Sequence, residues 1–204
     1  MYAQLLIALS FAIAAYQDAR ERAVSDLVWI PGGAAVVYIL YSFYIGAVPD
    51  FPFFLLKLAL IGGIALGFTF FGFVGQADGI AIALIAADPY VLSPLLPLLA
   101  AAVVAAGHIG YEFWRGNARA KAIPMGRFLK EQCWIPKAII SDGVRTEVSS
   151  DVNKAREEVV AAGKPDATVE VRYGVPTVAY LGVGYVAYIV YIILVSYAVF
   201  AALP

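Results

Sequence analysis

Apolar residues gather in six runs along the chain, and polar residues collect between them. The runs cover residues 2–16, 27–46, 53–74, 79–87, 91–114 and 175–203. A helix needs about 20 apolar residues to cross the ~30 Å hydrocarbon layer of a membrane. The first run is slightly short for this, and the fourth is too short to cross alone. The pattern predicts an all-α polytopic membrane protein with six transmembrane helices, the fourth of them abbreviated.

Composition supports this class and excludes several others. Of the 204 residues, 62% are hydrophobic and 14% are charged, against roughly 25% charged in soluble domains. Such a chain is too apolar to be disordered. The net charge of -1 provides no polycation for nucleic acid. The single cysteine, Cys133, allows neither an internal disulfide nor a cysteine-based metal cage, and we expect no metal and no cofactor.

One polar segment interrupts the membrane pattern between the fifth and sixth runs. In residues 115–172, the β-rich stretches 134–140 and 144–148 flank Ser141-Asp142-Gly143, which is a hairpin signal. Residues 150–162 are typical of a helix ended by Gly163 and Pro165, and residues 168–171 of a strand. We therefore predict three parts: a membrane domain over 1–114, a small α+β insert over 115–172, and a sixth transmembrane helix within 173–204.

Basic residues predict the orientation. Arg20 and Arg22 lie between the first two runs, eleven more lie between residues 115 and 172, and only Lys57 falls elsewhere. The positive-inside rule then places both loops in the cytoplasm and both termini outside a plasma membrane. Residues 115–130 are basic without an acid and are expected to lie on anionic lipid headgroups. Lys57 is predicted near the outer end of the third helix, with its stem reaching to the interface. The first run lacks the preceding Lys or Arg of a signal peptide, so we expect it to remain as a helix.

Acidic residues at the membrane boundary are the candidates for chemistry, because ionisable groups are costly there. Asp50 and Asp88 stand beside prolines in turn positions and indicate structural roles. Asp26 follows Ser25 before the second helix and suits an N-cap. Glu112 lies one helical turn from His108, which favours a hydrogen bond between them.

Asp18 and Asp78 differ from these because the topology puts both at the cytoplasmic face, on different helices. Asp78 stands in the glycine-dense stretch 72–79, downstream of a GxxxG pattern at Gly63 and Gly67 that is typical of close helix packing. Two carboxylates at one membrane depth can share a proton and activate water. The plain alternative is that Asp78 caps the fourth helix and Asp18 faces water.

Two short motifs resemble those of a known peptidase family. Residues 18–26, DARERAVSD, resemble the first-aspartate motif D-x-R-x-x-x-[IV]-[PS]-[ND] of type IV prepilin peptidases. Gly75-Gln76-Ala77-Asp78 resembles their second motif, G-x-[GA]-D, which is shared loosely with intramembrane GxGD aspartic proteases. The layout, and Gly174-Val175-Pro176, resemble the archaeal branch, the prepilin and preflagellin (prearchaellin) peptidases. The chain departs from the family pattern at Gln76, where a second glycine is common, and at Ile80, where a lysine is common.

The resemblance implies an aspartic endopeptidase that removes a short basic leader from archaellin or type IV pilin-like precursors at the cytoplasmic membrane face. Its implied partners are these precursors and membrane lipids, and its catalytic residues would be Asp18 and Asp78. Helix dipoles favour Asp78 as the base and Asp18 as the acid. The residues with implied loop-shaping or substrate-binding roles are Gly75, Gln76, Ala77, Gly79, Glu21, Asp26, Gly174 and Pro176. For Pro176, a role in starting the last helix is an equal alternative.

Three other functions remain open on the sequence. A proton-coupled transporter could use Asp18 and Asp78 as a relay. A scaffold without catalysis could use the insert as a docking module. A cysteine protease would need Cys133 and His108 as its nucleophile and base.

Overall fold

A computed structural model describes residues 2–47, 50–89, 94–117, 120–131, 133–149, 152–162 and 167–202. The chain forms two compact units. The first comprises Met1–Asp18, Val24–Ala105 and Thr177–Pro204, and the second comprises Ala19–Ala23 and Ala106–Pro176. This division groups the loop after the first helix, and the C-terminal part of the fifth predicted span, with the polar insert.

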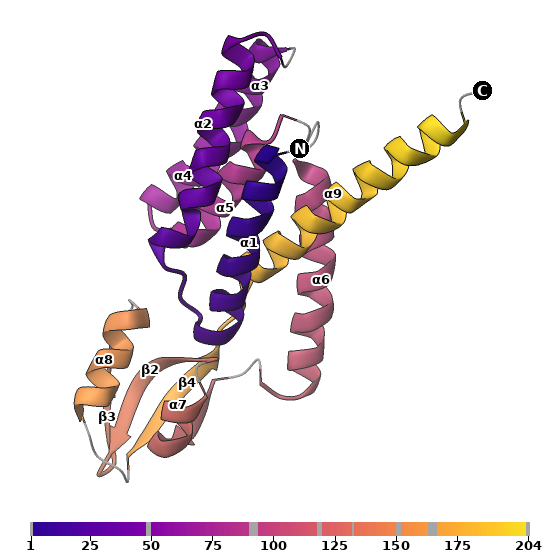
Figure 1. Ribbon diagram of the computed structural model, residues 1–204. Coiled ribbons are helices and arrows are strands. Elements are labelled where there is room, and N and C mark those ends of the chain that lie inside the picture. The colour runs from indigo at the N-terminus through magenta and orange to yellow at the C-terminus, as the bar shows by residue number, and fades with distance from the viewer. Residues whose placement is uncertain are drawn as a thin grey trace. The chain divides into compact units, whose positions relative to one another are not determined.

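The first unit is helical. Its elements are α1 (Tyr2–Glu21), η1 (Asp26–Trp29), α2 (Ile30–Tyr44), α3 (Phe51–Lys57), η2 (Leu58–Gly62), α4 (Gly63–Phe70), α5 (Gln76–Ala87), the first part of α6 (Leu95–Trp114) and α9 (Thr177–Ala202) (Figure 1). The segments α3, η2 and α4 follow one another without a break, and η2 is a π-helical turn.

Four helical stretches in the described part of the chain are long and apolar enough to cross a membrane. They are Asp26–Tyr44, Phe51–Phe70, Leu95–Trp114 and Thr177–Ala198. The chain is therefore mostly helical and has the character of a polytopic membrane protein. Helix α5 has only 12 residues. Helix α1 has 20 residues, but its glutamines, Ser10 and Asp18 lower its hydropathy.

The core of the first unit forms where aromatic side chains of three helices meet. The ring of Phe11 stacks on Tyr185 with centroids 5.3 Å apart, and meets Trp29 edge-on at 6.2 Å. Ile7 and Ile85 are fully buried beside them. The backbone N–H of Gly32 donates to Ser10 Oγ at 2.8 Å, so α1, η1–α2, α5 and α9 share one core.

Two glycines bring helices of this unit into close contact. A Cβ on Gly79 of α5 would lie 1.9 Å from Thr69 Oγ1 of α4, and one on Gly184 of α9 would lie 2.3 Å from the backbone oxygen of Pro97 in α6. The expected close packing at Gly63 and Gly67 is wrong, because a Cβ on either would have nothing within 4 Å. Helix α4 instead turns Thr69 toward α5.

The second unit contains a four-stranded antiparallel sheet in the order β1-β4-β2-β3. The strands are β1 (Lys121–Pro124), β2 (Trp134–Ser141), β3 (Val144–Glu147) and β4 (Thr168–Tyr173). Helix α8 (Val152–Ala162) packs on β2, and α7 (Met125–Lys130) lies beside β1 and β4 (Figure 1). The apolar side chains between these helices and the sheet include Ile123, Phe128, Trp134, Val159, Val169 and Val171.

The predicted α+β character of the insert is confirmed. Asp142 and Gly143 both have positive φ, 54° and 76°, as a type I′ turn between two paired strands requires. The predicted strand at residues 168–171 is β4, and α8 begins at Val152. Strand β1 and helix α7 were not predicted within the basic stretch 115–130. The expected helix stops, Gly163 and Pro165, lie outside the described residues.

Candidate active site at the aspartates

Asp18 lies in the last turn of α1 and is buried, with 7% of its surface exposed. Its Oδ2 accepts a hydrogen bond from the backbone N–H of Ala179 at 3.1 Å. Ala179 belongs to the first turn of α9, where backbone N–H groups lack partners within the helix and the helix dipole is positive. The carboxylate of one helix therefore caps the start of another, and this arrangement stabilises its negative charge.

Asp78 lies in the first turn of α5. Gly75 precedes the helix in an extended conformation, and its carbonyl accepts the N–H of Gly79 at 3.0 Å. A Cβ on Gly75 would lie 3.1 Å from Asp78 Oδ2, so the glycine gives the carboxylate room. Ala77 packs against the helical core, whereas the side chain of Gln76 is exposed. The glycines of this motif thus determine how Asp78 is held.

The two aspartates belong to the same unit and are close enough for their charges to interact. Helix α5 packs on α9, and α9 holds Asp18 through Ala179. The helix of Asp78 therefore packs on the same helix, α9, that bonds Asp18. Two interacting carboxylates resist being ionised together, so one tends to keep its proton. This is the electrostatic requirement for a pair in which one group acts as a base and the other as an acid.

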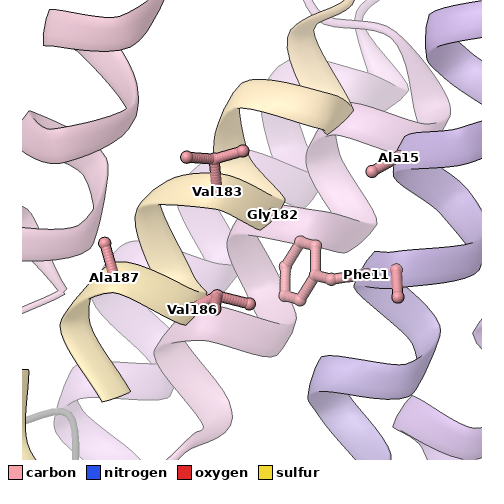
Figure 2. Close-up of a pocket in the computed structure, with 7 residues that line it drawn as sticks. Phe11, Ala15, Gly182, Val183, Val186 and Ala187 are labelled. Atoms are coloured by element: carbon pink, nitrogen blue, oxygen red, sulfur yellow. The ribbon is translucent and has the colours of Figure 1, made fainter. Parts of the chain in front are cut away.

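An apolar groove runs along the two helices that meet at Asp18. It has a volume of about 350 Å³ and is lined by Phe11, Ala12, Ala15, Gly182, Val183, Val186 and Ala187. Figure 2 shows Phe11 and Ala15 on α1 opposite Val183 and Val186 on α9. Ala15 is less than one helical turn from Asp18, and Gly182 is a similar distance from Ala179. The groove therefore leads toward the carboxylate and offers only apolar side chains and backbone.

The remaining residues implied by the motifs fall in different places. Glu21 is the exposed last residue of α1. Gly174 is buried, and a Cβ there would lie 3.1 Å from Ile135 Cδ1. Pro176 directly precedes α9. These three residues belong to the second unit, whereas Asp18 and Asp78 belong to the first.

The expected N-cap at Asp26 is wrong. Asp26 is the first residue of η1 and is exposed, and Ser25 takes the cap position without a side-chain capping bond. The backbone N–H of Ser25 instead donates to Gln17 Oε1 at 2.9 Å. Asp50 has a left-handed conformation with φ of 65° just before α3, as its predicted turn position allows.

The other titratable candidates lie in the second unit. His108 Nε2 is 3.7 Å from Glu112 Oε1, which is an ion-pair distance rather than the predicted hydrogen bond. Glu112 instead accepts a 2.7 Å hydrogen bond from Asn117 Nδ2. Burial raises the pKa of the Cys133 thiol, so the thiol is neutral at physiological pH. An activated nucleophile requires the opposite shift, so this environment disfavours a cysteine protease.

A second polar cluster, which the sequence pattern did not predict, lies in the first unit. Asp88 is fully buried, and its carboxylate accepts hydrogen bonds from Gln4 Nε2 at 3.2 Å and Tyr185 Oη at 2.8 Å. Lys57 Nζ donates to the backbone oxygen of Asp88 at 2.6 Å. We refer to Gln4, Lys57, Asp88 and Tyr185 as the Asp88 cluster.

The Asp88 cluster corrects the prediction for Lys57. Lys57 is only 6% exposed, so its side chain turns inward instead of reaching to the membrane interface. Asp88 directly follows α5, and its carboxylate is a buried acceptor of hydrogen bonds from other helices, which its turn position alone did not predict. The signal was present in the sequence, since Lys57 is the one charge in a long apolar run and Asp88 ends the short one. Each is the natural partner of the other.

No group of three or more potential metal-ligating side chains occurs in the part of the chain that the structure describes. No family model, curated protein or solved structure matches the chain.

Proposed function

We propose that this protein is a membrane-embedded aspartic endopeptidase that cleaves precursors carrying a basic leader followed by an apolar helix. The observation that carries the proposal is the pair of interacting carboxylates, Asp18 and Asp78, supplied by different helices of one unit. The resemblance of residues 18–26 and 75–78 to the two aspartate motifs of prepilin and preflagellin peptidases supports the same conclusion. Archaellin and type IV pilin-like precursors are the proposed substrates.

The hydrogen bonding favours a division of roles between the aspartates. The N–H of Ala179 stabilises the ionised form of Asp18. We therefore assign Asp18 as the base and Asp78 as the acid, which reverses the assignment from helix dipoles alone. Asp18 takes a proton from water, the water oxygen attacks the scissile carbonyl carbon, and Asp78 protonates the carbonyl oxygen. When the C–N bond breaks, the leaving nitrogen takes the proton from Asp18, and the diol returns a proton to Asp78.

The apolar groove supports the substrate class. It lies along α1 and α9, the helices that hold Asp18, and it has only apolar side chains. A substrate helix lying in this groove would bring the residues at its end close to Asp18. The small residues Ala12, Ala15 and Gly182 would let that helix approach closely.

Contacts within the second unit support a six-span topology. Arg22 Nη2 donates to Tyr173 Oη at 3.1 Å, so the loop at 19–23 and the sheet lie on one side of the membrane. Three of the long apolar stretches, Asp26–Tyr44, Phe51–Phe70 and Leu95–Trp114, separate them along the chain. Three crossings would leave them on opposite sides, so a fourth crossing is needed. Helix α5 is the apolar helix that can supply it, with α1 and α9 completing six.

The length of α5 accounts for the buried Asp88. Twelve residues extend about 18 Å, which is well short of the ~30 Å apolar layer. A short helix that starts at the cytoplasmic face with Asp78 must end within the layer. Its terminal carboxylate then requires partners from neighbouring helices, and Gln4, Lys57 and Tyr185 provide them.

A proton-coupled transporter is the second candidate, and one observation favours it. The first unit holds two acidic centres, the buried Asp18 with the half-buried Asp78, and the Asp88 cluster. Between Asp78 and Asp88, however, α5 contains only glycine, alanine, leucine and isoleucine. This helix offers no side chain that could relay a proton between the centres, so we prefer the peptidase.

Cleavage of a panel of type IV pilin-like precursors in membranes tests the proposal. Asp18→Asn and Asp78→Asn should each abolish cleavage, since each removes a group that must exchange protons. Asp142→Asn is the matched control, because Asn also adopts the left-handed conformation of that turn, and it should cleave normally. Normal processing by either site variant would overturn the proposal. Proton flux into liposomes without cleavage would favour the transporter.

A further inference from the structure

The Asp88 cluster connects the same three helices that form the aspartate site. Gln4 belongs to α1 with Asp18, Asp88 ends α5 with Asp78, and Tyr185 belongs to α9 with Ala179. Lys57 adds the α3–η2–α4 helix, on which α5 packs. Each helix of the site is therefore held at two levels, once at the aspartates and once at the cluster.

The two levels are well separated along the helices. Asp88 comes ten positions after Asp78 along α5, which corresponds to about 15 Å. Tyr185 comes six positions after Ala179 along α9, which corresponds to about 9 Å. A helix fixed at one point can still slide and rotate, whereas polar contacts at a second point fix its register. The cluster is thus too far from Asp78 to act in the chemistry and well placed to set its position.

The cluster is also costly to build, which argues against an incidental role. All four of its residues are buried, with exposed fractions between 0% for Asp88 and Tyr185 and 9% for Gln4. A buried ammonium and a buried carboxylate are rarely worth more than apolar residues in stability alone, but they specify one arrangement of their neighbours. The π-helical turn η2 starts directly after Lys57, and such turns are frequent at functional positions in helices.

We propose that the Asp88 cluster is a positioning network that sets the register of α1, α5 and α9, so that Asp18 and Asp78 meet. Lys57, Asp88, Gln4 and Tyr185 are positioning residues in this network and touch no substrate. Its consequence for cleavage rests on the proposed function, whereas its effect on the distance between the two aspartates does not. This separation allows the two proposals to be tested independently.

The first experiment measures geometry without activity. Cysteines replace Asp18 and Asp78 in a Cys133→Ala background, so that the chain has only these two thiols, and a short bifunctional thiol reagent links them. Tyr185→Phe removes a single hydroxyl from the cluster, and Asp88→Asn removes its charge. Each should slow cross-linking severalfold. The matched control, Tyr191→Phe on the same helix but 58% exposed, should leave the rate unchanged.

The second experiment measures cleavage kinetics with both aspartates intact. Tyr185→Phe and Asp88→Asn should lower kcat by about tenfold or more with little change in KM, because misplaced catalytic groups lose rate and not binding. Cross-linking at the parental rate in both variants would overturn the positioning network, whatever the cleavage result. Slower cross-linking in a protein that cleaves no precursor would support the network and overturn the peptidase. Should Asp88→Asn fail to fold, the comparison of cross-linking rates between Tyr185→Phe and Tyr191→Phe tests the network by itself.

Discussion

Asp18 has a structural role as well as a proposed chemical one, and substitutions can separate the two. Its Oδ2 accepts the Ala179 N–H at the start of α9. An asparagine can still accept this bond through its amide oxygen, whereas an alanine cannot. We expect Asp18→Ala to lower the free energy of unfolding by about 1 kcal/mol more than Asp18→Asn, as for other lost helix caps. Thermal unfolding in detergent measures this difference, and equal stability of the two variants would contradict the capping role.

Cys133 allows a test of the second unit by pH. Burial is the largest cause of the raised pKa of its thiol, partly offset by the positive charge of Arg22. A raised pKa means a smaller thiolate fraction at neutral pH, so alkylation by iodoacetamide should be slow at pH 7 and accelerate only as the pH rises above the ordinary thiol range. The control is Val144→Cys in a Cys133→Ala background, since Val144 is 64% exposed. If Cys133, which is half-buried, reacted as fast as this control at pH 7, the pKa of its thiol would not be raised.

At the level of helices, the contact between α4 and α5 depends on Gly79. A Cβ there would overlap Thr69 Oγ1, which is itself bonded to the Ala65 carbonyl at 3.0 Å, and would come within 3.1 Å of Thr69 Cβ. Gly79→Ala should force α5 away from α4 and lower the free energy of unfolding by about 1–3 kcal/mol. It should also reduce cleavage, because Asp78 is the preceding residue.

The matched control for Gly79 lies on the facing helix. Gly63→Ala and Gly67→Ala each place a Cβ where nothing lies within 4 Å. Because alanine favours a helix over glycine, these two variants should be as stable as the parent or slightly more stable. Thermal unfolding of all three variants checks the assignment. If Gly63→Ala or Gly67→Ala lowered the free energy of unfolding as much as Gly79→Ala, the GxxxG interface predicted from the sequence would be supported after all.

Elements set by local chemistry were predictable, and elements set by distant contacts were not. The hairpin at Ser141-Asp142-Gly143 was found because its turn residues determine the backbone locally. The start of α5 was found because the glycines precede an apolar run. Strand β1 has only four residues and lies in the basic stretch 115–130. It exists because it pairs with β4, some 45 residues further along the chain. Such a strand has no local signal.

The same distinction applies to the sites. Asp18 and Asp78 could be paired from the sequence because their motifs and their predicted common membrane face both indicated them. The Asp88 cluster was missed although Lys57 and Asp88 stand out as charges in apolar runs, since its members come from four separate helices and Asp88 stands beside a proline, where a turn is the local expectation. The capping of α9 by Asp18 was missed for a similar reason. It joins residues 161 positions apart, and it changes which aspartate is expected to be ionised.

At the level of the whole molecule, the six-span topology makes a definite prediction about sidedness. With α5 crossing, Gly46 and Asp88 lie toward the outside, and the loop at 19–23 and the insert lie in the cytoplasm. If α5 did not cross, the insert would lie opposite that loop, with eleven of the 14 basic residues outside, and Arg22 could not reach Tyr173. The contact at 3.1 Å and the positive-inside rule therefore both favour the proposed crossing.

Cysteine accessibility in intact cells measures this sidedness. In a Cys133→Ala background, Gly46→Cys should react with a membrane-impermeant maleimide, whereas Val144→Cys and Arg20→Cys should react only after the membrane is permeabilised. Val144 and Gly46 are both exposed in the structure, so a difference between them reports the membrane and not burial. If Val144→Cys were labelled in intact cells while Arg20→Cys was protected, α5 would not cross. The six-span layout on which the resemblance to the proposed peptidase family partly rests would then be wrong, whereas Asp78, in the first turn of α5, would stay on the same face as Asp18.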